Sequence, residues 1–132
     1  MSKTITQKIL FKNTTPKVLY DLYMDAKKHS DVTGGKAVIT KKEGTKFSAY
    51  NKYITGKNLQ LIKDKLIVQS WRASDWQATD MDSTFILSFT QKGNDVVMEM
   101  VHANVPDEQA KSLTTGWDEY YWKPMKAVLK RL

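Results

Sequence analysis

The chain has 132 residues, which is the size of one domain, and we expect a single domain over 1–132. It contains no cysteine, which excludes disulfides, thiolate metal sites and thiol nucleophiles, and which agrees with a cytoplasmic location. No apolar run is long enough for a transmembrane helix, and the first eight residues lack the apolar core of a signal peptide.

The formal net charge of +7 is unevenly distributed along the chain. Residues 1–66 carry 14 Lys against 5 acidic residues, whereas residues 67–132 carry 7 basic and 9 acidic residues. Only Arg72 and Arg131 are arginines, although arginine is the preferred residue for binding phosphates and bases. The pattern favours a solvated lysine-rich surface over a nucleic-acid interface.

The N-terminal third predicts a strand followed by two short helices. Residues 4–11 are rich in β-formers and predict the strand. Thr15 is a suitable N-cap and Pro16 suits the first helical position, so a helix should run from 16 to about 25. A second short helix or turn is expected over 26–31, closed by two glycines at positions 34 and 35.

The middle of the chain predicts short strands that are separated by tight turns. The close spacing favours an antiparallel meander, because parallel strands need long crossovers. Alternation makes one face of this sheet apolar: Phe85, Leu87 and Phe89 share a side, as do Met98, Met100 and His102, and as do Ile67, Gln69 and Trp71. The expected strands are 36–40, 45–50, 53–62, 65–72, 83–92 and 95–103.

The last element is predicted to be one long helix that covers the apolar face. Pro106-Asp107-Glu108 is typical of a helix N-terminus. Helical spacing places Trp117 and Tyr121 toward the sheet and Trp122 at the boundary with solvent. Pro124 lacks an N–H group, so we expect the helix to bend there. The resulting fold class is α+β, with the order β-α-α-β6-α.

Several short motifs, taken in order along the chain, resemble those of one family. They are Thr15-Pro16, Leu19-Tyr20, Lys46-Phe47-Ser48, Gly56, Lys65 to Gln69, Trp71-Arg72, Trp76, Val105-Pro106, Gly116-Trp117 and Tyr121-Trp122. Through these motifs the chain is similar to the C-terminal domain of the activator of heat-shock protein 90 ATPase and to its stand-alone bacterial relatives. The resemblance implies membership of the SRPBCC or START-like superfamily, which has the helix-grip fold.

The resemblance implies a cavity between the sheet and the C-terminal helix for an apolar or amphipathic small molecule. Inward alternation and the resemblance together predict a ligand site without catalytic residues. Core packing is the alternative role for the same side chains, and hydrogen bonding within the core is the alternative for Gln69 and His102. The predicted site consists of Phe47, Tyr53, Gln69, Trp71, Phe85, Met100, His102, Trp117 and Tyr121.

Two other functions stay open from the sequence. The first is a chaperone-associated factor with a heat-shock protein 90 homologue as its partner, and the second is a cyclase- or aromatase-like enzyme. We expect no cofactor and no metal, because the two histidines are not clustered. We expect a monomer or a homodimer. The acidic segment with Asp75, Asp80 and Asp82 reads as a solvated loop, beside which Arg72 has a structural role or stacks on a tryptophan.

Overall fold

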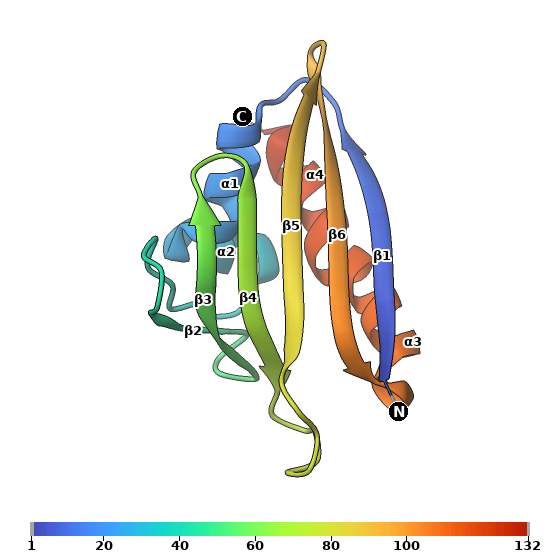
Figure 1. The fold of residues 1–132 in the computed structure, drawn as a ribbon. Coiled ribbons are helices and arrows are strands. Elements are labelled where there is room, and N and C mark those ends of the chain that lie inside the picture. The colour runs from blue at the N-terminus through green and yellow to red at the C-terminus, as the bar shows by residue number, and fades with distance from the viewer. Residues whose placement is uncertain (1, 132) are drawn as a thin grey trace.

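Six antiparallel strands form one curved sheet, and the helices cover one of its faces (Figure 1). The computed structural model describes residues 2–131. The strand order across the sheet is β1-β6-β5-β4-β3-β2, so that β1 returns to pair with the last strand. The strands are β1 (Ser2–Phe11), β2 (Lys46–Ala49), β3 (Ile54–Ile62), β4 (Leu66–Ala73), β5 (Ser83–Lys92) and β6 (Asp95–Pro106).

Alternation along the central strands is confirmed by burial. In β4 and in residues 83–89 of β5 every second side chain is buried, and Ile67, Phe85 and Leu87 are wholly inaccessible to solvent. The registry places Gln69 opposite Phe85, and Phe85 opposite His102, so that the three strands present one continuous inner face. This face supplies most of the core, and the predicted α+β fold class is confirmed.

The two predicted short helices are present as α1 (Pro16–Met24) and α2 (Ala26–Thr33). Thr15 accepts a hydrogen bond from the backbone of Val18, and Pro16 begins α1. Asp25 caps α2 through the backbone N–H of Lys28, and Gly34 ends the helix with a positive φ of 82°. The capping residues therefore delimit both helices as their chemistry requires.

The prediction of a strand over residues 36–40 is wrong. This segment makes only an isolated bridge between Val38 and Ser48. Its backbone hydrogen bonds go elsewhere: the N–H of Lys36 donates to the Asn51 side chain, and the N–H of Ala37 donates to the Ser30 hydroxyl. Because side chains satisfy these groups, the segment does not need a strand ladder.

The C-terminal helix contains a π-helical turn that periodicity did not predict. It consists of α3 (Asp107–Trp117), the π turn η1 (Asp118–Trp122) and α4 (Lys123–Leu129), which follow one another without a break. In η1 the backbone N–H of Lys123 donates to the carbonyl of Asp118, five residues back. The irregularity that Pro124 was expected to cause thus lies in the turn before it. Within residues 2–131, no helix is both long enough and apolar enough to cross a bilayer.

The π turn corrects the prediction for Trp122. Its side chain is buried, with 1% of its surface exposed, and its indole nitrogen donates to the Gln7 side chain of β1 over 2.7 Å. The wider turn rotates the helix so that Tyr121 and Trp122 both face the core, whereas ordinary helical spacing places Trp122 to one side of the face that Trp117 and Tyr121 share.

Candidate binding site

An interlocked aromatic cluster fills the space where the sheet and the C-terminal helix meet. The ring of Trp117 stacks on Phe85 with 4.4 Å between centroids, and Tyr121 lies 4.8 Å from Trp117. Trp71 closes the cluster at 5.7 Å from Trp117. Five of the predicted site residues are buried and are not among the groove-lining residues described below: Phe47, Gln69, Phe85, Met100 and His102.

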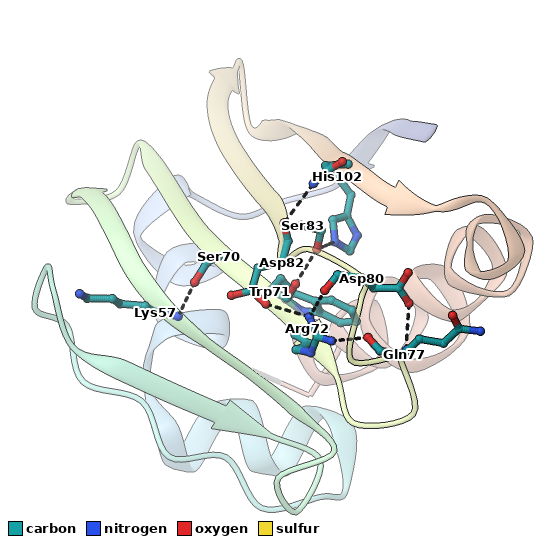
Figure 2. A network of polar contacts seen from close by, with 10 residues as sticks. Lys57, Ser70, Trp71, Arg72, Gln77, Asp80, Asp82, Ser83 and His102 are labelled. Carbon is teal, nitrogen blue, oxygen red and sulfur yellow. Dashed lines mark hydrogen bonds and ion pairs between the residues drawn. The ribbon is translucent and has the colours of Figure 1, made fainter. Parts of the chain in front are cut away.

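His102 belongs to a hydrogen-bond chain that fixes its protonation state (Figure 2). The Trp117 indole N–H donates to Nδ1 over 3.1 Å, so Nδ1 must be unprotonated. Nε2–H therefore donates to Ser83 Oγ over 2.8 Å, and Ser83 in turn donates to the Trp71 carbonyl. Burial lowers the pKa of His102 to about 3, so the imidazole is neutral at physiological pH.

A second chain of buried polar groups runs through His29, which the sequence analysis did not select. Its Nδ1–H donates to the carbonyl of Tyr23 over 2.7 Å, so its Nε2 accepts from the Tyr121 hydroxyl at 2.9 Å. Burial lowers the pKa of His29 to about 4, and the bond to Tyr23 opposes this shift. Tyr121 is thereby held in place by an internal partner.

Both the oxygen and the nitrogen of the Gln69 side-chain amide form hydrogen bonds. Tyr23 Oη donates to its oxygen over 2.9 Å, and its nitrogen donates to Asn58 Oδ1 over 2.8 Å. Asn58 completes the chain by donating to the Thr40 carbonyl. Five buried residues with polar side chains are hydrogen-bonded within the protein: His29, Asn58, Gln69, Ser83 and His102. These five side chains therefore have partners inside the fold, whereas the buried indole nitrogens of Trp71 and Trp76 have none within residues 2–131.

An open groove of about 430 Å³ lies between the C-terminal helix and the β2–β3 end of the sheet. Four of the predicted site residues line it, namely Tyr53, Trp71, Trp117 and Tyr121. Sequence reasoning missed the others, which lie on a turn, at the start of β3 or on the flank of the helix: Tyr50, Ile54, Gln109, Ser112, Leu113, Gly116 and Tyr120. The lining includes no charged residue.

The walls of this aromatic groove have two unusual features. The residues 50, 51 and 52 all have positive φ, at 51°, 56° and 73°, although none of them is glycine. This left-handed turn presents Tyr53, whose side chain is 43% exposed and whose hydroxyl donates to Asp75. Gly116 lies within α3, and a Cβ there would meet only the Tyr120 ring, at 3.8 Å. Packing does not explain why this helical position is a glycine, and its bare backbone keeps the groove open.

The predicted acidic loop is confirmed as exposed, and Arg72 has the structural role (Figure 2). Its guanidinium donates to the carbonyls of Asp80 and Gln77, each over 2.6 Å. It also pairs with the Asp82 carboxylate at 3.2 Å. In the part of the chain that the structure describes, no three His, Cys, Asp or Glu side chains are placed to hold a metal.

A curved antiparallel sheet closed by a long C-terminal helix, with two short helices beside it, defines the START-like class of α+β folds. The family model for "Activator of Hsp90 ATPase homolog 1-like protein" matches residues 13–130, and the chain belongs to this family.

Individual relatives agree with this assignment. The chain is 28% identical over 117 residues to an "Activator of 90 kDa heat shock protein ATPase homolog" from Dictyostelium discoideum, covering 88% of this chain and 30% of that protein. It is 26% identical over 127 residues to the human homolog 1, covering 94% and 37%. The chain thus spans about a third of these curated relatives. The solved structure of an HSP90 activator from Plasmodium falciparum superposes with a TM-score of 0.86 at 26% identity, covering 98% of this chain and 96% of that one.

Proposed function

We propose that this chain is a cytoplasmic, chaperone-associated binding domain that engages a heat-shock protein 90 homologue. The observation that carries the proposal is the end-to-end match to the Plasmodium falciparum HSP90 activator, because that chain is hardly longer than this one. A domain of this size is therefore compatible with that role.

The interior of the protein favours recognition at the surface. The rings of the aromatic cluster pack with 4.4 to 5.7 Å between centroids, and Gln69 and His102 are hydrogen-bonded to other buried side chains. A cyclase- or aromatase-like reaction would need free polar groups inside a cavity, but Gln69 and His102 already use theirs. Binding partners therefore meet the exposed surface, including the aromatic groove.

The test is to titrate the purified chain into the heat-shock protein 90 homologue of the same organism. Calorimetry should detect a complex, and the ATPase rate of the chaperone should change with the same concentration dependence. Absence of both effects at several hundred micromolar would contradict the proposal. An unrelated START-like domain of similar net charge serves as a control for non-specific electrostatic binding.

The aromatic groove favours a second candidate function, which is the binding of an apolar or amphipathic small molecule. Its volume lies within the range of about 300–1,000 Å³ that is usual for ligand sites, and its walls are mainly aromatic. The Trp71 indole nitrogen is buried and has no hydrogen-bond partner within residues 2–131.

Gly116 allows a matched test of this candidate. Gly116→Leu places a side chain in the groove, whereas Gly116→Ala fits without a close contact. Native mass spectrometry of the wild-type protein should show a co-purifying molecule. We expect Gly116→Leu to lose it and Gly116→Ala to retain it. A wild-type protein that carries nothing, or a Leu variant that binds as well as the Ala variant, would exclude the groove as the site.

A further inference from the structure

The segment 74–82, which connects β4 to β5, extends past the ends of the strands, at the bottom of the view in Figure 1. Most of its residues are exposed, and it carries the side chain of Met81. With 75% of its surface exposed, Met81 is the most exposed large apolar residue within residues 2–131. A single exposed apolar residue on a mobile loop would need no explanation.

This loop, however, is fixed along its length. Arg72 reaches out of β4 and donates to the Gln77 and Asp80 carbonyls, each over 2.6 Å. The Asp80 carboxylate accepts from the Gln77 backbone N–H at 2.9 Å. These contacts cross-link the middle of the loop to the strand that precedes it (Figure 2).

The two ends of the loop are fixed as well. The backbone N–H of Ser74 donates to the Tyr53 carbonyl over 2.7 Å, and Asn104 donates to the Asp82 carbonyl over 3.2 Å. Trp76 is buried, with its ring 5.7 Å from that of Trp71. The backbone is thus held on both sides of Met81, while the Met81 side chain remains exposed.

The charge of the loop differs from that of the rest of the chain. The loop contains Asp75, Asp80 and Asp82, and Arg72 is the cation paired with the last of these at 3.2 Å. Two carboxylates therefore remain in excess on a protein whose net charge is +7. A surface that receives this loop should be basic around an apolar pocket, because opposite potentials favour encounter and fix orientation.

We propose that the loop 74–82 is a preorganised docking loop. Met81 inserts into an apolar pocket of a partner protein, and basic residues around that pocket face the acidic residues of the loop. The inference rests on the proposed chaperone function and names the surface through which the chain engages the heat-shock protein 90 homologue. Preorganisation matters because a loop already held in its bound shape loses little entropy on binding. Methionine suits the role of anchor because its unbranched side chain adapts to the shape of a pocket.

The experiment measures binding of the same chaperone homologue by calorimetry for wild type and variants. Met81→Ala removes the anchor without touching a packed residue. Leu59→Ala is the matched control, because Leu59 is also an exposed apolar residue, at 48%, but lies on β3. Arg72→Lys keeps the positive charge but loses the paired contacts to the loop carbonyls. Thr79→Lys and Thr79→Glu change the charge at an exposed loop position beside Met81.

We expect Met81→Ala to weaken binding about tenfold or more, while Leu59→Ala stays within about twofold. Arg72→Lys should weaken binding although Met81 is intact, and circular dichroism should show it folded. Thr79→Lys should weaken binding and Thr79→Glu strengthen it, with a difference that shrinks at high salt.

Binding by Met81→Ala that equals wild type would overturn the docking loop and leave the chaperone function standing. Equal losses in Met81→Ala and Leu59→Ala would also overturn it, because they indicate non-specific apolar contact. A wild-type chain that does not bind the chaperone overturns both the inference and the proposed function.

Discussion

The two buried histidines make the folded state sensitive to mild acid. His29 and His102 are neutral in the fold, with pKa values of about 4 and about 3, whereas an unfolded histidine titrates near 6.5. The unfolded chain therefore binds more protons than the folded chain as pH falls below about 6.5. The stability conferred by the neutral histidines is complete above that pH. It is lost as pH falls toward about 4 for His29 and about 3 for His102.

The size of the effect follows from the difference between the histidine pKa values in the unfolded and folded states. For each histidine, the free energy of unfolding falls by about 1.4 kcal/mol per pH unit once the imidazole of the unfolded chain is protonated. From pH 7 to pH 5 this amounts to roughly 2 kcal/mol for each residue and about 4 kcal/mol for the pair. Because both folded pKa values lie below 5, the expected loss over this interval depends little on where below 5 they fall.

Urea unfolding followed by tryptophan fluorescence at pH 7 and pH 5 measures the loss directly. The variant His102→Gln should show about half of the pH dependence, although it is less stable at neutral pH. NMR of the imidazole nitrogens provides an independent check, because both rings should remain neutral at pH 5 in the folded protein. A stability change below about 1 kcal/mol, or a folded histidine that titrates near 6.5, would refute the reasoning.

Four further variants test the backbone and the core by urea unfolding. Lys52→Gly should stabilise the protein by up to about 1 kcal/mol, because a lysine at φ 73° is strained; a loss of stability would mean that the lysine side chain contributes more than the strain costs. Gly56→Ala should cost about 3 kcal/mol or more, since a Cβ would lie 1.9 Å from the Ser70 carbonyl oxygen. Gly116→Ala is the control, because a Cβ there makes only an ordinary contact with the Tyr120 ring at 3.8 Å, and it should gain about 1 kcal/mol; equal stability changes in the two alanine variants would contradict the geometry. Trp122→Ala should cost about 3–5 kcal/mol as a core residue, whereas a cost below about 1 kcal/mol would indicate the solvent boundary.

The sheet could be predicted because its period is unambiguous. In β5 the residues Phe85, Leu87 and Phe89 share one face, the opposite face carries Thr84, Ser88 and Thr90 beside Ile86, and the structure buries the first face. The helix starts were predictable for a similar local reason, since Thr15 and Pro16 act on the turn that follows them. Features that are determined by a few neighbouring residues could therefore be predicted from the sequence.

The buried hydrogen-bond networks could not be predicted in this way, because the residues that they connect are far apart in the sequence. His29 meets Tyr121 across 92 positions, and Gln7 meets Trp122 across 115. A lone histidine on a short helix gives no sign of its partner. The left-handed turn at residues 50–52 was equally hidden, since tyrosine and lysine are not residues that prefer positive φ. The groove depends on that turn and on the empty position at Gly116, so its outline emerges only in three dimensions.

The π turn explains how one short aromatic segment supports both the core and the groove. An α-helix that presents Trp117 and Tyr121 to the sheet turns Trp122 away from it. The extra residue in η1 brings Trp122 to Gln7 on β1, while Tyr121 keeps its bond to His29. Proline at position 124 favours this arrangement, because it cannot donate the hydrogen bond that an ordinary turn would require there. The same geometry leaves Tyr120 on the outer side, 57% exposed, where it forms a wall of the groove. A segment built in this way stabilises the fold through two tryptophans and leaves a tyrosine exposed on the surface.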